Sequence, residues 1–90
     1  MDVYEAIRRM RKLSQDKKPF AVAFMSYSAE RGKSHGIVEI SRCVLTKQST
    51  VEQNKHADIM LNYYDLDANK NGRMYQPLLL EFNGIQLELN

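Results

Sequence analysis

Ninety residues, 43% of them hydrophobic and 27% charged, are typical of one small globular domain. The longest apolar run, Phe20–Met25, is far shorter than the ~20 residues of a membrane span, so we expect no membrane partner. With a single cysteine in the chain, a cytoplasmic location is the simplest expectation. The single cysteine, Cys43, excludes an internal disulfide and any site that needs several cysteines.

The net charge of +2 is unevenly distributed along the chain. Residues 1–18 hold six Lys and Arg against three Asp and Glu, whereas residues 56–90 hold two against five. The two parts can complement each other, within the fold or between copies of the chain. The excess is too small to indicate nucleic-acid binding by itself.

Residues 2–14 have the pattern of an amphipathic helix. Asp2 is a suitable N-cap and Glu5 follows three residues later, which is an aspartate variant of the capping box. One apolar stripe at 3-4 spacing contains Val3, Ile7 and Met10. The helix should end before Pro19, because proline disfavours helical geometry at the preceding residue.

Two strands are predicted after the helix. Phe20–Tyr27 is apolar on both faces, which is typical of a central strand, and we expect its small alanine face to lie under the helix. Ser28–Gly36 is a polar loop. In Ile37–Lys47 the alternation changes phase near Ser41 and Arg42, which indicates a β-bulge that keeps a single buried face.

The second half of the chain alternates strands and turns. Gln48–His56 has no clear period and fits either a loop or one helical turn. Ile59–Asp65 has the alternation of a strand, and Asp65–Gly72 is a turn region that includes the pair Asn71-Gly72. Residues 73–89 are predicted to form a hairpin around Asn83-Gly84, because both central residues of a type I′ turn need a positive φ.

Pro77 lies inside the first strand of this hairpin. Proline cannot donate to a ladder, so we expect it at a sheet edge, in a bulge, or with its nitrogen facing away from a partner. One face of the strand is assigned to Met74, Leu78, Leu80 and Phe82. Leu79 then points the other way, towards the helix, a barrel neighbour or a second protein molecule. The candidate protein interface is therefore Tyr75, Pro77 and Leu79.

Together these elements predict an α+β fold in a single domain over residues 1–90. An amphipathic helix and a basic link occupy residues 1–18, and a five-stranded, mainly antiparallel meander sheet occupies residues 19–90. A sheet this small either curls into a partly open barrel or covers one face with the helix.

No motif predicts an enzyme, a cofactor or a metal site. Asp65–Gly72 resembles the start of a calcium loop, but Lys70 stands where that loop needs glycine and Gln76 where it needs glutamate. We therefore expect a polar hairpin loop in which Asp and Asn side chains bind neighbouring backbone amides. Cys43 falls among apolar residues, as a small core residue does.

Two kinds of function fit this chain. The first is a non-enzymatic structural or interaction protein that associates with itself or with another protein, since edge strands of a small sheet invite pairing. The second is a small nucleic-acid-binding module. Its contact residues would be Arg8, Arg9, Arg11, Lys12, Lys17 and Lys18. It also requires stacking platforms beside them, for which the candidates are Tyr27, Tyr63, Tyr64 and Tyr75.

The chain resembles small uncharacterised proteins encoded in bacterial prophages and related mobile elements. The resemblance covers most of its length, in the stretches DVYEAIRRMR, PFAVAFMSYS followed by GKSHGIVEI, YYDLD and YQPLLLEFNG. It implies a cytoplasmic product that serves as a virion-assembly or connector component, or a small accessory protein acting on phage DNA. No active-site residues can be transferred to this chain from the resemblance. The resemblance favours the structural and DNA-binding functions over an enzyme.

Overall fold

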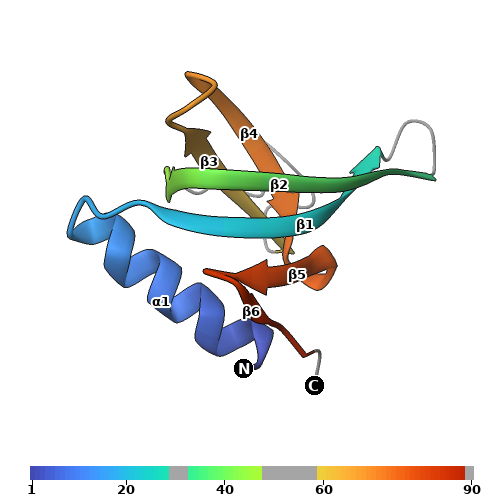
Figure 1. Cartoon of the computed structure of the whole chain (residues 1–90), viewed down its shortest axis with the longest axis horizontal. Coiled ribbons are helices and arrows are strands. Elements are labelled where there is room, and N and C mark those ends of the chain that lie inside the picture. The colour runs from blue at the N-terminus through green and yellow to red at the C-terminus, as the bar shows by residue number, and fades with distance from the viewer. Residues whose placement is uncertain (29–32, 48–58, 89–90) are drawn as a thin grey trace.

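The computed structural model describes residues 1–28, 33–47 and 59–88, in which one helix packs against a curved sheet (Figure 1). In chain order the elements are α1 (Val3–Gln15), β1 (Phe20–Ser28), β2 (Lys33–Leu45), β3 (Met60–Asp65), β4 (Lys70–Tyr75), the 3-10 turn η2 (Gln76–Leu78), β5 (Leu79–Phe82) and β6 (Ile85–Gln86). The α+β class is confirmed, but the described residues form six strands instead of five, and the sheet is not closed. The segment Gln48–His56 lies outside the described residues.

The strands lie in the order β4-β3-β2-β1-β5-β6, and every ladder between them is antiparallel. β1 to β4 form the expected meander. β5 then pairs with the other edge of β1 instead of with β4, so the prediction of a simple meander is wrong at this point. η2 is the physical reason, because Pro77 has no N–H to donate and divides the predicted long strand into β4 and β5.

α1 begins at the predicted N-cap, where the Asp2 carboxylate accepts a hydrogen bond from the Glu5 amide at 2.7 Å. Its buried face consists of Val3, Ala6, Ile7 and Met10. This face packs on the side of β1 that carries the larger apolar residues, including Phe20 and Phe24, which gain most from burial. The small alanine face of β1 lies on the opposite side of the sheet, so the expectation that it lies under the helix is wrong.

No helix within the described ranges is long and apolar enough to cross a bilayer.

A β-bulge in β2 is confirmed where the sequence predicts it. Phe20 pairs with Cys43 while Val22 pairs with Ile40, so β2 contains one residue more than β1 over this stretch. The extra residue restores the phase of the core face, and Ile40 and Cys43 are both buried.

A second bulge determines the orientation of Leu79. Ala23 pairs with Glu81, but the next residue of β1, Phe24, pairs with Leu79. The extra residue in β5 turns both Leu79 and Phe82 towards the core, where they are 3% and 2% exposed. The predicted core face is therefore right at Met74 and Phe82 but wrong at the three leucines, and residues of the same chain cover Leu79.

The two Asn-Gly pairs have different roles. Asn83 and Gly84 have φ values of 49° and 80° and join Phe82 to Ile85, which confirms the type I′ turn. Asn71-Gly72 instead lies within β4, because the connection from β3 turns at residues 66–69. Gly72 is needed there for space, since a Cβ atom would overlap the ring of Tyr63 on β3.

Candidate interaction surfaces

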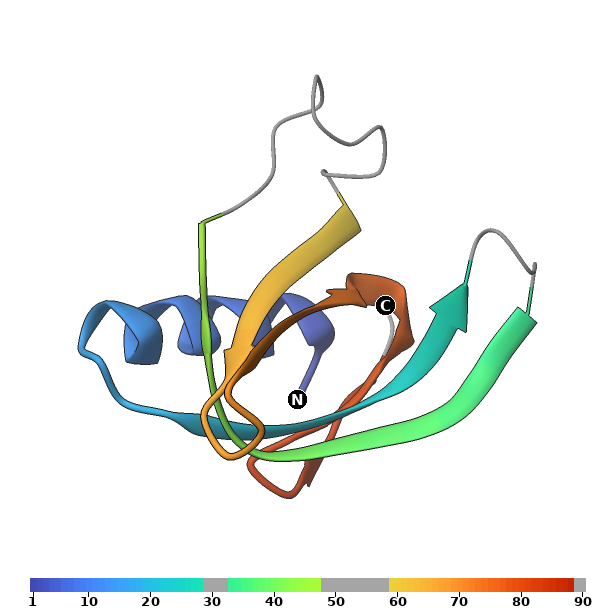
Figure 2. The ribbon, with the colours of Figure 1, turned by 90° about the horizontal axis from the view of Figure 1, so that it is seen from above.

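The β1–β2 hairpin projects beyond the rest of the sheet (Figure 2). β5 pairs with β1 only as far as Phe24, and β3 pairs with β2 only over Cys43–Leu45. Beyond these points Met25–Ser28 and Lys33–Ile37 pair with each other and with no other described strand. We call these two segments the arm.

β2 has an unpaired edge that continues from the arm into the body of the sheet. No described residue pairs with Lys33–Ser41 on the side away from β1; we call this side the free edge of β2. Its middle carries Ile37, which is 61% exposed. A long unpaired edge with an exposed β-branched residue is a typical place for pairing with another chain.

The other two edges of the sheet are protected against such pairing. The strand β6 is only two residues long, and Glu88 beyond it makes a parallel bridge to Asp2. In that bridge the Glu88 amide donates to the Met1 carbonyl at 2.9 Å, and the Val3 amide donates to the Glu88 carbonyl at 3.2 Å. The edge strand β4 carries the exposed cations Lys70 and Arg73, which disfavour pairing.

The three residues predicted as a protein interface lie around η2. Leu79 belongs to the core and offers no surface for a partner. Tyr75 is half-buried and pairs with Met60 across the β3–β4 ladder, while Pro77 is exposed. Of the three predicted residues, only Pro77 is exposed at this junction.

The predicted basic cluster divides into two sets on α1. Arg9 forms an ion pair with Glu5 at 3.2 Å, and Lys12 lies 3.8 Å from the carboxylate of Asp16. Arg8 is exposed and has no ion pair within the described part of the chain.

The remaining three cations of the cluster are also exposed without an ion pair to any described residue: Arg11, Lys17 and Lys18. Lys17 and Lys18 follow the end of α1, so their positive charge continues from the helix. The sequence grouped all six cations together because it could not show which of them have a carboxylate partner.

An exposed aromatic residue lies beside the unpaired arginines. Tyr4 is 63% exposed on α1. With 3.6 residues per turn, Tyr4, Arg8, Arg11 and Gln15 fall within roughly 60° of one another around the helix; we call this row the ridge. Tyr4 is absent from the sequence-based candidates, although its spacing of four and seven residues from the two arginines could have identified it.

The predicted stacking tyrosines do not gather beside the basic helix. Tyr63 is buried and meets Phe24 edge-on, with ring centroids 5.9 Å apart, and burial raises the pKa of its hydroxyl. Tyr64 alternates with Tyr63 and so lies on the other face of the sheet, where its hydroxyl donates to Asn69 at 3.2 Å. The side chain of Tyr27 lies outside what the structure describes.

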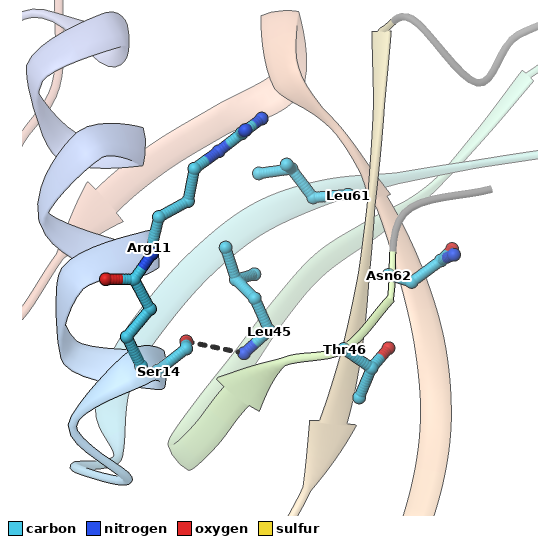
Figure 3. Close-up of a pocket in the computed structure, with 7 residues that line it drawn as sticks. Arg11, Ser14, Leu45, Thr46, Leu61 and Asn62 are labelled. Carbon is cyan, nitrogen blue, oxygen red and sulfur yellow. Dashed lines mark hydrogen bonds between the residues drawn. The ribbon is translucent and has the colours of Figure 1, made fainter. Parts of the chain in front are cut away.

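A groove of about 260 Å³ runs between the last turns of α1 and the ends of β2 and β3 (Figure 3). Its lining consists of Arg11, Ser14, Gln15, Leu45, Thr46, Leu61 and Asn62. The Ser14 hydroxyl donates to the Met10 carbonyl at 2.7 Å and accepts from the Leu45 amide at 2.8 Å, which ties α1 to β2. Leu45 and Leu61 give the groove an apolar floor, and Arg11 extends across it.

The chain makes a hydrogen-bonded turn at residues 66–69, which is shorter than the predicted turn region Asp65–Gly72 because β4 begins at Lys70. The Asp65 carboxylate accepts from the amides of Asp67 and Ala68 at 3.0 and 3.1 Å. The Asp67 carboxylate in turn pairs with Arg42 at 2.6 Å. Over residues 1–28, 33–47 and 59–88 we find no group of three or more His, Cys, Asp or Glu that could hold a metal ion.

Cys43 is a core residue, as its sequence context indicates. The side chain is fully buried, and this desolvation, with a smaller contribution from Asp65, raises its pKa to about 12. The thiol is therefore protonated at neutral pH and is a poor nucleophile.

No family model matches the chain, and neither a curated protein nor a solved structure is significantly similar to it. The candidate surfaces therefore rest on their own geometry.

Proposed function

We propose that this chain is a cytoplasmic, non-enzymatic interaction protein that associates with a second copy of itself through the free edge of β2. The observation that carries the proposal is that no described residue pairs with the backbone of Lys33–Ser41 on the side away from β1. The prophage-like stretches of the sequence support an assembly or accessory role.

The free edge of β2 is better suited to pairing with a second chain than the other edges of the sheet are. A free strand edge presents alternating N–H and C=O groups that a second strand can bind. β4 carries two cations on its edge, and the chain after β6 pairs with the N-terminal residues. The free edge of β2 combines greater length with an exposed apolar side chain, Ile37.

Multi-angle light scattering over a range of protein concentrations tests this proposal. The mass of the parent should rise above that of one chain as the concentration increases. Ile37→Lys should reduce this association, because an edge lysine opposes strand pairing. The matched control is Ile85→Lys, which places the same charge at a 42% exposed position on β6. A parent that stays monomeric at millimolar concentration, or two variants that associate equally, would contradict the proposal.

Nucleic-acid binding by the basic side of α1 is a second candidate function. The observation that favours it is the ridge, in which an exposed tyrosine lies in line with two arginines that have no ion pair to any described residue. A mobility shift with nucleic acid that weakens with added salt would support this function, and no shift at low salt would exclude it.

A further inference from the structure

We infer that the ridge and the adjoining groove form a binding site for single-stranded nucleic acid; this inference rests on the second candidate function, nucleic-acid binding by α1. Arg8 and Arg11 bind backbone phosphates. The Tyr4 ring stacks on one base, and the groove beside Arg11 receives another base.

The spacing of the ridge suits an extended strand. At 1.5 Å per residue, Tyr4 to Gln15 covers ~16 Å along α1. The aromatic residue is at one end and the groove at the other, with the arginines between them. A single strand that lies along the helix therefore meets a stacking group, then cations, then an apolar recess.

The charges of α1 favour this side of the helix for a polyanion. Glu5 and Asp16 form their ion pairs with Arg9 and Lys12, which lie further round the helix than the ridge. Arg8 and Arg11 have no ion pair to any described residue, and a guanidinium binds phosphate through two parallel hydrogen bonds.

The stacking group and the groove favour single strands over duplex. Bases in a duplex stack on one another and cannot turn their faces to Tyr4, whereas unpaired bases can. The groove has an apolar floor of Leu45 and Leu61, with the polar side chains of Arg11 and Gln15 beside it, which suits the face and edge of a base. Its volume of about 260 Å³ is smaller than the ~300–1,000 Å³ of sites that enclose small molecules.

Fluorescence anisotropy with a labelled oligothymidylate of roughly 12 nucleotides tests the inference, with a duplex of equal length for comparison; this length lies within the ~4–16 nucleotides of known single-strand sites. The single strand should bind more tightly than the duplex. Tyr4→Ala should weaken binding by about 5-fold or more, since it removes a stacked base. Arg8→Ala and Arg11→Ala should each reduce the slope of log affinity against log salt by about 0.7.

Arg9→Ala is the matched control, because it removes the same charge from the same helix on the side where Glu5 neutralises it. It should leave the salt slope unchanged. Equal losses in Arg9→Ala and Arg8→Ala would overturn the assignment to the ridge. An unchanged affinity in Tyr4→Ala would overturn the stacking contact.

The remaining outcomes separate this inference from the function on which it rests. Equal affinity for duplex and single strand would overturn the preference for single strands but keep nucleic-acid binding as a function. No binding to either at low salt would overturn both. Full displacement of the oligonucleotide by equimolar polyglutamate would show that the ridge takes acidic polypeptides instead, which also overturns the inference.

Discussion

The two ends of the β1–β2 hairpin lie in different surroundings although the same two strands form them. Near α1, Val22–Phe24 lie between β2 and β5, Cys43 lies between β1 and β3, and the helix covers the core face of this end. In the arm, Met25–Ser28 and Lys33–Ile37 pair only with each other within the described part of the chain. The first end stabilises the fold, and the second offers backbone groups for a partner.

This difference separates stability from association. A substitution near α1 should change the free energy of unfolding, because the affected side chains are buried. A substitution at Ile37 in the arm should change association instead, because this exposed side chain does not contribute to the core. The comparison of Phe24→Ala with Ile37→Ala tests this separation directly, and changes at two glycines and the titration of Cys43 test the stability of the rest of the fold.

Phe24→Ala should lower the free energy of unfolding by about 3–5 kcal/mol, the usual cost of truncating a buried aromatic residue. Phe24 is 4% exposed and packs edge-on against Tyr63. Ile37→Ala in the arm should change the same quantity by less than about 0.5 kcal/mol. Urea denaturation of the two variants at low protein concentration measures both effects, and equal losses would show that the arm belongs to the core.

Gly72→Ala should lower the free energy of unfolding by about 1–3 kcal/mol, because the added methyl group overlaps the ring of Tyr63. The control is the same substitution in a Tyr63→Ala background, where the methyl group has room. In that background Gly72→Ala should lower the free energy of unfolding by clearly less, and a double-mutant cycle measures the difference. Additive losses would mean that steric overlap with Tyr63 is not the cause.

Gly84→Ala should destabilise the fold by on the order of 1 kcal/mol, because alanine is strained at a φ of 80°. Nothing lies near the added methyl group, so the cost is conformational and not steric. Gly84→Asn should cost less, since asparagine tolerates a positive φ. The melting temperatures of the two variants measure this difference. An alanine variant that is as stable as the parent would contradict the type I′ turn.

The stability of the fold should fall as the pH rises from 9 towards 12. The pKa of Cys43 is raised from 9.0 to about 12 in the folded chain, so the unfolded chain loses its proton first and the folded state loses its advantage. At pH 10 the loss should be about 1 kcal/mol. Burial also raises the pKa of Tyr63, so Cys43→Ala should reduce the slope of stability against pH without abolishing it. A slope that does not change in Cys43→Ala would contradict the buried neutral thiol.

Local chemistry explains which parts of the fold could be predicted from the sequence. The Asp2 cap, the bulge near Ser41 and the turn at Asn83-Gly84 each depend on a few adjacent residues, and the structure confirms them. The path of the chain after Pro77 could not be predicted in this way. Alternation does not specify which distant strand becomes the neighbour, and β5 pairs with β1 across more than fifty residues.

The candidate sites were harder to predict, because they also depend on contacts that the local sequence pattern does not specify. The sequence identifies the cations of α1 but does not show that Glu5 neutralises Arg9 while Arg8 has no carboxylate partner in the described chain. Alternation places Leu79 in a candidate interface instead of the core, because a bulge that shifts alternation by one residue is set by the partner strand.

Hydrogen–deuterium exchange at several protein concentrations tests the central claim, association through the free edge of β2, most directly. The amides of Lys33–Ser41 that point away from β1 should exchange fast in dilute solution and become protected as the concentration rises. The amides of β5 and β6 should show the same protection from exchange at every protein concentration. Exchange in β2 that does not depend on concentration, or new protection confined to β4 or β6, would contradict the account.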